Sequence, residues 1–303
     1  MISVYASAAL LNHFNNGNAM PSIPTLYTGL HSGIPASDTG IVPEVSLSAW
    51  INYKRAGTPR STTGYPLITT GRVGSNATAI GNGTSGTVNS FLASGSGCVL
   101  SGISTIQLTG WSLWDAATGG NLLCYTNFST LNGSSSRALS NGGVFAIDAG
   151  KQQFTFSAEG LPDFEARNYL NVLLNGMGFS RSAYWLGALT STTGTEVSSS
   201  VWTNYKRLKV TRDVTTFPTT STNAITNGVT LGTGAGGSDN SWFSTGSTAV
   251  TTSDLPLAAI GIYDAATNGN LCWIASETAS SGFTLINNST LTLAIGSLTM
   301  QIK

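Results

Sequence analysis

Residues 44–55 read EVSLSAWINYKR, and residues 196–207 read EVSSSVWTNYKR. The two stretches are identical at nine of twelve positions, align without a gap and lie 152 positions apart. Farther along the chain, DAATGGNL at 115–122 is matched by DAATNGNL at 264–271. Two blocks that recur in the same order at nearly the same spacing indicate a duplicated domain of about 145 residues.

The two copies meet near residues 157–162, where SAEGLP interrupts the alternation of apolar residues. We therefore predict a first repeat over residues 1–158 and a second over 159–303. A shorter echo precedes the first block, because Leu10-Leu11-Asn12 matches Leu173-Leu174-Asn175. This echo predicts that the beginnings of the two repeats are equivalent as well.

Each repeat begins with a pattern typical of a short helix. Apolar residues near helical spacing predict one helix over about residues 4–14, and a second over 164–175 with Asp163 as its cap. After each helix, Ser, Thr, Val and Ile alternate between recurrent Gly/Asn clusters, which indicates short strands and turns. We expect a mainly β protein of two tandem antiparallel β-sandwich, jelly-roll-like domains, each preceded by a short helix.

The composition excludes several classes of function. The chain has 303 residues with 13 basic and 13 acidic side chains, so its formal net charge is zero and it lacks the basic excess of a nucleic-acid binder. No apolar run is long enough to span a membrane, and the N-terminal residues do not resemble a signal peptide. Three cysteines without a CxxC pair predict free, buried or half-buried thiols, and we expect no metal and no cofactor.

The repeated blocks contain the residues that we predict to be structurally important. A Glu–Arg ion pair would anchor loops, the Trp would pack in the core, and the Asp would cap a hairpin turn. Neither a nucleophile nor a second acid or base recurs at a fixed spacing from this pair, so we predict no catalytic residue. The repeated residues are Glu44, Trp50, Tyr53, Lys54, Arg55, Asp115 and Asn121 in the first copy, and Glu196, Trp202, Tyr205, Lys206, Arg207, Asp264 and Asn270 in the second.

Two of these features have an alternative interpretation. Glu44 and Arg55 could be a catalytic or ligand-binding pair, and Trp50 and Trp202 could be platforms for a sugar. Separately, residues 81–86 match G-x-G-x-x-G, but no long helical pattern follows them, so we do not expect dinucleotide binding.

Together the blocks resemble a family of small bacteriophage virion proteins, of the tail-fibre or capsid-decoration kind. Three segments carry the resemblance: Leu26–Ser32, Glu44–Arg55 and Asp115–Leu123. In the second copy the first of these segments is degenerate. The resemblance implies a tandem duplication of a β-sandwich virion protein without catalytic activity.

The function expected first is that of a capsid decoration (cement) protein. It would be made in the host bacterial cytoplasm, bind the major capsid protein on the outer surface of the virion, and stabilise capsomer contacts as a homo-trimer, with no nucleic-acid or membrane partner. The alternative is a tail-fibre or baseplate-associated, lectin-like protein that binds a surface glycan. That alternative predicts exposed clusters among Trp111, Trp114, Trp185, Trp242 and Trp273. A virion glycan hydrolase, which would need paired carboxylates, is the third hypothesis.

Overall fold

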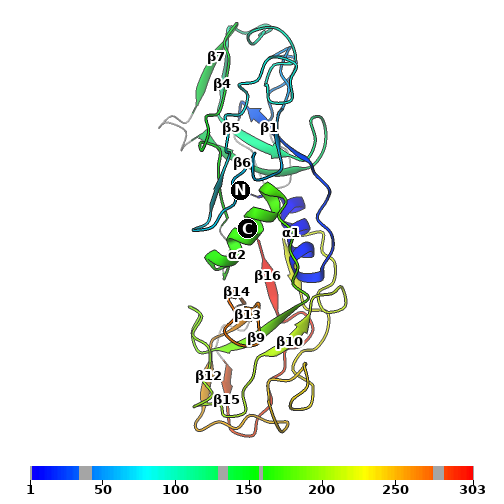
Figure 1. Cartoon of the computed structure of the whole chain (residues 1–303), viewed down its shortest axis with the longest axis vertical. Helices are drawn as coiled ribbons and strands as arrows, with labels where there is room; N and C mark the ends of the chain where they lie inside the picture. Colours follow the sequence, from blue (N-terminus) through cyan, green and yellow to red (C-terminus); the bar gives the residue numbers. More distant parts are fainter. Residues whose placement is uncertain (1, 34–42, 129–135, 157–159, 276–282, 303) are drawn as a thin grey trace. The chain divides into compact units, whose positions relative to one another are not determined.

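The computed structural model describes residues 2–33, 43–128, 136–156, 160–275 and 283–302 (Figure 1). The chain divides into two compact units. Unit 1 comprises Met1–Ser7, Pro21–Phe156 and Leu170–Gly178, and unit 2 comprises Ala8–Met20, Ser157–Tyr169 and Phe179–Lys303. Each unit therefore contains most of one repeat together with a helical segment from the other repeat.

Within the described residues, the first repeat contains α1 and eight short strands. Their bounds are α1 (Val4–Asn16), β1 (Thr25–His31), β2 (Ala56–Pro59), β3 (Val73–Ser75), β4 (Thr105–Leu108), β5 (Gly110–Trp114), β6 (Leu122–Asn127), β7 (Arg137–Ser140) and β8 (Gln153–Thr155). The central sheet is antiparallel with the order β2-β1-β5-β6, and two further two-stranded ladders pair β3 with β8 and β4 with β7.

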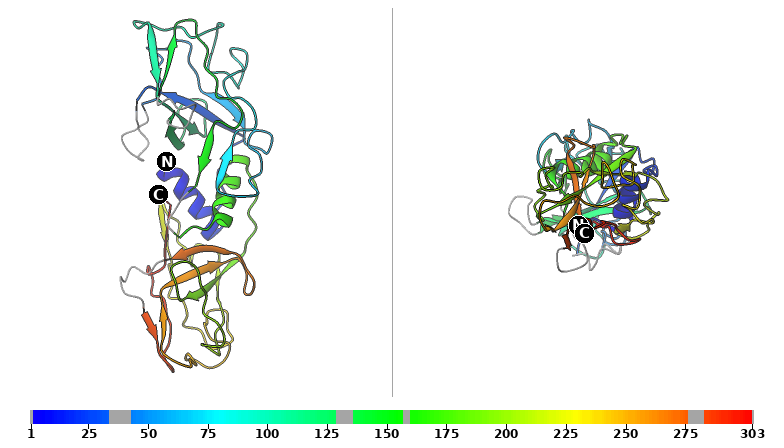
Figure 2. Two further views of the ribbon diagram at one scale, coloured as in Figure 1. Left: turned by 90° about the vertical axis from the view of Figure 1, so that its left-hand side faces the viewer. Right: turned by 90° about the horizontal axis from the view of Figure 1, so that it is seen from below.

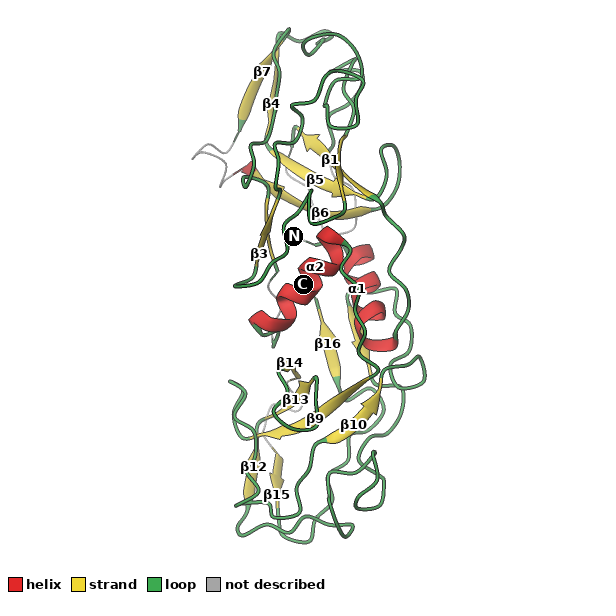
Figure 3. Ribbon diagram, in the orientation of Figure 1, coloured by secondary structure: helices red, strands yellow, loops and turns green. Residues whose placement is uncertain are grey.

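The second repeat has the same elements in the same order. They are α2 (Asp163–Asn175), β9 (Ala183–Leu189), β10 (Leu208–Thr211), β11 (Ala224–Thr226), β12 (Leu255–Leu257), β13 (Ala259–Tyr263), β14 (Leu271–Ala275), β15 (Phe283–Leu285) and β16 (Thr299–Gln301). Its central sheet has the equivalent order β10-β9-β13-β14, and its two ladders pair β11 with β16 and β12 with β15. The fold class is confirmed: two mainly β halves, each preceded by a short helix (Figure 3).

The duplication extends to irregular features. The pairing of β5 with β6 shifts register between Leu113 and Trp114, and that of β13 with β14 shifts between Ile262 and Tyr263. The turn that follows contains a left-handed residue at the same place, Gly119 with φ of 58° and Asn268 with φ of 53°. Gly and Asn are the residues that adopt this conformation at low cost, which confirms the turn predicted for the DAAT(G/N)GN block.

The core of each unit is rich in aromatic residues. Trp50, Tyr65 and Phe91 in unit 1, and Trp202 and Trp242 in unit 2, are almost completely buried. Cys98, Cys124 and Cys272 are free and buried, as predicted. Burial raises the pKa of the Cys124 thiol to about 12, so this thiol stays protonated and behaves as a small apolar side chain.

The two helices differ from the prediction in their alignment. Asn16 donates to Asn12 at 3.0 Å, and Asn175 donates to Asn171 at 3.0 Å, so the helices align at an offset of 159. The expected equivalence of Leu10-Leu11-Asn12 with Leu173-Leu174-Asn175 is therefore wrong by four residues, about one helical turn. Within unit 2 the ring of Phe14 from α1 stacks on Tyr169 from α2, with centroids 3.9 Å apart. Figure 2 shows the ribbons of the two helices side by side.

The predicted boundary between residues 158 and 159 lies outside the described residues. The chain passes from one compact unit to the other at further places as well. Two of these lie inside the helices, after Ser7 in α1 and after Tyr169 in α2. Long-range packing of the helices is the reason, and local sequence patterns carry no information about it.

His31, in β1, is a polar residue buried in unit 1. Its side chain is fully inaccessible, and within the described residues neither ring nitrogen makes a hydrogen bond. Burial lowers the pKa of His31, and backbone groups nearby and the charge of Glu44 oppose this only in part. The equivalent residue is Leu189, since His31 and Leu189 make the same isolated bridge to Glu44 and Glu196 respectively.

We expect acid to destabilise unit 1 through His31. Because the folded state has the lower pKa, the unfolded state binds more protons below about pH 6.5, and the free energy of unfolding falls as the pH is lowered through that range. The variant His31→Leu should show a weaker dependence of melting temperature on pH between about pH 8 and 5. An unchanged pH dependence in this variant would contradict the assignment.

Candidate functional site

The carboxylate of Glu44 lies at the centre of the first repeated block. Its Oε1 accepts hydrogen bonds from the Tyr53 hydroxyl and the Arg55 Nε, both at 2.9 Å, and its Oε2 accepts one from the Arg55 Nη2 at 2.8 Å. The Tyr53 hydroxyl in turn accepts a bond from the backbone N–H of Leu30, in β1, at 2.8 Å. We call Glu44, Tyr53 and Arg55 the brace, because together they tie the repeated block to the central sheet.

Arg55 extends the brace to the hairpin turn between β5 and β6. Its Nη1 donates to the carbonyls of Ala116 at 2.9 Å and Gly119 at 2.7 Å, and its guanidinium lies 3.7 Å from the centre of the Trp114 ring. Asp115 closes the same turn by accepting bonds from the backbone and side-chain nitrogens of Asn121. Arg is suited to this position because its planar fork binds a carboxylate, two carbonyls and an aromatic face at once.

The second repeat has an equivalent brace. Glu196 Oε1 accepts bonds from Tyr205 at 2.6 Å and from Arg207 Nε at 2.9 Å, and its Oε2 accepts one from Arg207 Nη2 at 2.7 Å. Arg207 donates to the carbonyl of Ala265 and lies 3.5 Å over the ring of Tyr263, which takes the place of Trp114. Asp264 binds Asn270 as Asp115 binds Asn121.

Trp50 and Trp202 lie in the core. Both are fully buried, and their indole N–H groups donate to Asn52 and Asn204, each at 2.9 Å. A buried ring face cannot stack on a sugar, so the platform interpretation of these two residues is wrong. Of the five other candidate platforms only Trp185 is half-buried; Trp111, Trp114, Trp242 and Trp273 are buried.

Asn52 and Asn204 were not among the residues predicted to be structurally important. Asn52 Nδ2 donates to the carbonyls of Ser94 and Gly97 while its Oδ1 accepts from the N–H of Val99, and Asn204 makes the equivalent contacts in the second repeat. The signal was available, because this Asn is identical in both copies of the quoted block. Each Asn satisfies otherwise unpaired backbone groups of a long loop.

The repeated lysines have a similar role at the surface of the same loops. Lys54 donates to the carbonyl of Thr87, and Lys206 donates to the carbonyl of Ser238. The predicted residues of each copy therefore form three neighbouring groups: the brace with its lysine, the Trp–Asn core and the Asp–Asn turn. All three groups bind loops and turns to the sheet.

Both repeats match a known protein family. Residues 1–155 and 161–301 each match the model described as "Podophage GP4 fiber I protein gp80". The chain belongs to this family of phage fibre proteins. It is a structural protein of a bacteriophage virion with a tail-fibre-like role, and the tandem duplication inferred from the quoted blocks is confirmed. No curated protein matches the chain.

The pKa values of the brace residues in this fibre protein favour its hydrogen bonds. Burial and the neighbouring carboxylates raise the pKa of both Tyr53 and Tyr205, so their hydroxyls remain donors to Glu44 and Glu196. Burial alone would lower the pKa of Arg207, but its hydrogen bonds and charge pairing with Glu196 outweigh that and raise it. Among the described residues no group of three or more His, Cys, Asp or Glu side chains could hold a metal ion, and no helix is long and apolar enough to cross a bilayer.

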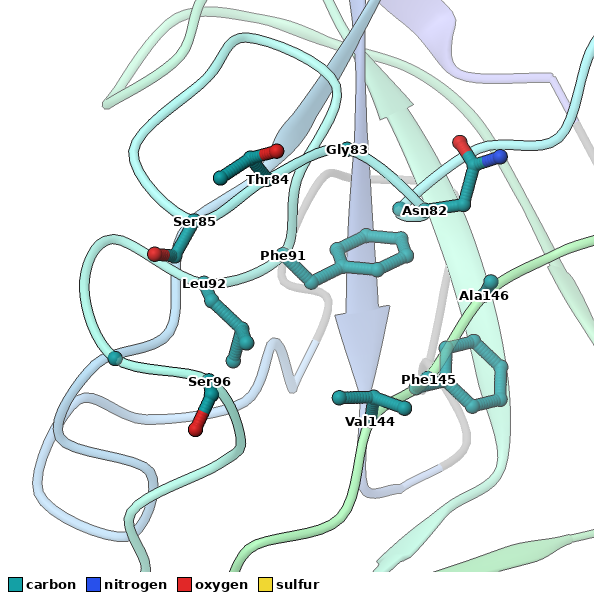
Figure 4. A pocket seen from close by; sticks show the side chains of 12 residues that line it. Asn82, Gly83, Thr84, Ser85, Phe91, Leu92, Ser96, Val144, Phe145 and Ala146 are labelled. Atoms are coloured by element: carbon teal, nitrogen blue, oxygen red, sulfur yellow. The ribbon is translucent and has the colours of Figure 1, made fainter.

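Two open pockets lie beside the repeated elements of the fibre protein. In unit 1, residues 81–85 of the G-x-G-x-x-G match line a cavity of about 520 Å³ together with Phe91, Val144 and Phe145 (Figure 4). Gly81, with φ of 84°, lets the loop pass over Phe91, because a Cβ there would lie 2.2 Å from the ring. The glycine thus serves close packing, and the described residues between β3 and β4 contain no helix whose N-terminus could bind a phosphate.

The second pocket lies in unit 2, beside the second brace. It has a volume of about 550 Å³ and is lined by Trp185, the brace residues, Lys209 and Asp239, among others. Lys209 and Asp239 form an exposed ion pair at 2.9 Å. The equivalent backbone pair in the first repeat is Gly57 and Val88, so the first repeat has apolar or small residues where the second has this ion pair.

Removing the charge of one brace carboxylate should destabilise the fibre protein measurably. Glu44→Gln keeps the shape but weakens three hydrogen bonds to a charged acceptor, and we expect a loss of about 1–3 kcal/mol in the free energy of unfolding of unit 1. Glu196→Gln should produce a similar loss in unit 2. Chemical denaturation of both variants measures these losses.

The matched control is Asp254→Asn, which removes one charge at an exposed position. This variant should change the free energy of unfolding by less than about 0.5 kcal/mol. If Glu44→Gln had no larger effect than the control, the brace would not be a stabilising element.

Proposed function

We propose that this protein is a non-enzymatic building block of a phage fibre, in which two copies of one braced β domain are joined in tandem. Membership of the fibre family over both repeats is the observation that carries the proposal. The geometry supports it, because the repeated polar residues are used within the protein to fix long loops.

The absence of catalysis is part of the proposal. Glu44 and Glu196 each accept three hydrogen bonds, and Asp115 and Asp264 each bind an asparagine, so all four repeated carboxylates are engaged in structural contacts. A glycoside hydrolase needs one carboxyl group free to give up a proton and another free to attack or to activate water. The repeated acids satisfy neither requirement.

The exposed surface is suited to many polar contacts. Only 26 of the 303 residues are charged, and hydroxyl, amide and glycine residues occupy most of the long loops. Such surfaces form wet interfaces in which water completes the hydrogen bonds. We propose that the protein contacts neighbouring fibre or tail components in this way.

The location can be tested on intact virions. An epitope tag at the C-terminus, detected by gold-labelled antibody in electron micrographs, should mark the fibres or the tail. Tail-less heads purified from the same tagged phage should carry no label. Labelled heads with unlabelled tails would overturn the fibre assignment.

The capsid-decoration role is the second candidate, because the same polar, nearly uncharged surface would also suit contacts repeated by symmetry on a capsid. It would place a homo-trimer on the major capsid protein at the outer surface of the virion. Label on the heads, together with heads that release DNA at a lower temperature when the protein is omitted, is the result expected for this role.

A further inference from the structure

Each helix of this protein is bound by residues of the repeat to which it does not belong in sequence. In unit 2, Arg212 donates to the carbonyls of His13 and Phe14, at the C-terminal end of α1. In unit 1, Arg60 donates to the carbonyls of Val172 and Leu173, at the C-terminal end of α2. The last carbonyls of a helix lack partners within the helix, and in both cases an arginine supplies them.

A second contact binds each helix side chain to a backbone segment. In unit 2, Asn12 Nδ2 donates to the Thr220 carbonyl at 2.7 Å, and the Thr220 N–H donates to Asn12 Oδ1 at 2.8 Å. In unit 1, Asn171 forms the same pair of bonds with Ile68, at 3.0 and 2.9 Å. An asparagine that uses both its donor and its acceptor on one residue fixes the helix in register and in orientation.

The two contacts are related by the sequence duplication. Arg60 and Arg212, like Ile68 and Thr220, lie 152 positions apart, the offset of the repeated block. The helix partners all lie 159 positions apart. Both kinds of contact therefore occur twice at the same two offsets. The first repeat binds α2 in the same way as the second repeat binds α1.

The helices share a sequence signal for this arrangement. Residues 12–17 read NHFNNG and residues 171–176 read NVLLNG, so each helix ends in Asn-x-x-x-Asn-Gly. The second Asn donates to the first, and the glycine adopts φ of 83° at Gly17 and 71° at Gly176. A Cβ on either glycine would lie 3.6 Å from the carbonyl oxygen of Arg212 or Arg60, so the helix end passes close to the arginine that binds it.

We propose that each repeat carries a docking site for the Asn-x-x-x-Asn-Gly helix of another repeat, and that the two repeats hold each other by reciprocal helix exchange. The site consists of Arg60 and the backbone of Ile68 in the first repeat, and of Arg212 and the backbone of Thr220 in the second. The partner that it fits is a second copy of the same kind of repeat. In this chain that partner is supplied by the tandem duplication, and the proposal does not rest on the assigned virion role.

The experiment cuts the link between the repeats in the folded, full-length protein. A protease site is inserted among residues 157–159, the protein is purified intact and then cleaved, and its mass is measured in solution under native conditions. We expect the two fragments to remain together at the mass of the uncut chain. Fragments that separate after cleavage would overturn the proposal.

Cross-linking tests whether the exchanged helix is what holds the two fragments together. In the cleavable protein, Asn12→Cys with Thr220→Cys should be joined by a short bis-maleimide into one band that contains both fragments. The matched control is Asn12→Cys with Ile68→Cys, which tests docking of α1 on the equivalent site of its own repeat. A cross-link within the first fragment in this control, without one between the fragments in the first variant, would overturn helix exchange even if the fragments stay together.

A third variant measures the contribution of the arginines. In the cleaved protein, Arg60→Ala with Arg212→Ala should increase the dissociation constant of the two fragments at least about tenfold, because each arginine makes two hydrogen bonds to helix carbonyls. Arg137→Ala, at an exposed position of β7, is the control and should leave the constant unchanged. Equal dissociation constants for the two variants would show that the arginines do not form the docking site.

Discussion

Replacing Arg181 alone by methionine is expected to lower the free energy of unfolding of unit 2 by about 3–5 kcal/mol, because a buried carboxylate would lose its counter-charge. Arg181 Nη1 lies 2.8 Å from Glu165 Oε1, and the Glu165 side chain is only 2% exposed. Burial raises the pKa of Glu165, although the charge of Arg181 opposes this. Removing the arginine leaves this buried carboxylate without its ion-pair partner, although the hydrogen bond from Asn168 Nδ2 at 2.7 Å stays.

The double variant Glu165→Leu with Arg181→Met should recover most of that loss and unfold within about 1 kcal/mol of the natural protein, since similar volumes of apolar side chain replace the pair. The first repeat already shows that such a core is possible. Its equivalent positions are Ala6 and Ile23, both buried and apolar. Denaturant unfolding followed by tryptophan fluorescence measures both variants, and a double variant as unstable as Arg181→Met would contradict this account.

The second large effect is expected from the buried tryptophans. Trp50→Ala should cost unit 1 about 3–5 kcal/mol, because it removes a fully buried ring and leaves a cavity. Trp202→Ala should cost unit 2 a similar amount. Trp50→Phe keeps an aromatic ring but removes the donor to Asn52 and part of the buried indole, so a smaller loss of about 1–3 kcal/mol is expected.

Calorimetry measures the stability of these three variants and of Trp185→Ala, which serves as the comparison. Trp185 is half-buried and lines an open pocket. Trp185→Ala should be the least destabilising alanine variant. If Trp50→Ala were no less stable than Trp185→Ala, the tryptophan of the repeated block would not be a core residue.

The repeated block made much of this site predictable. A Glu, a Tyr and an Arg recur with fixed spacing in a chain that has few charges, which indicates that they make the same contacts in both repeats. The structure shows these shared contacts in the two braces. The hairpin turn was predictable for a related reason, since Gly119 and Asn268 share a conformation that few residues adopt.

Other features could not be read from the sequence, for physical reasons. The Glu165–Arg181 pair occurs in one repeat only, so the comparison of repeats gives no signal for it. The leucines of α1 and α2 can be aligned in two registers one helical turn apart, and only the contacts of Asn12 and Asn171 select the correct one. The choice of docking site for each helix depends on tertiary packing, because the two repeats offer equivalent partners.

The reciprocal contacts of the helices also constrain how this protein can change over generations. A substitution at Arg212 affects the end of α1, which is encoded some 200 codons upstream, and a substitution at Arg60 affects α2 in the other repeat. The two halves therefore cannot diverge as independent genes would. A recombination event that replaced one repeat would have to bring both a compatible helix and a compatible acceptor, so the heritable unit of this fold is the pair.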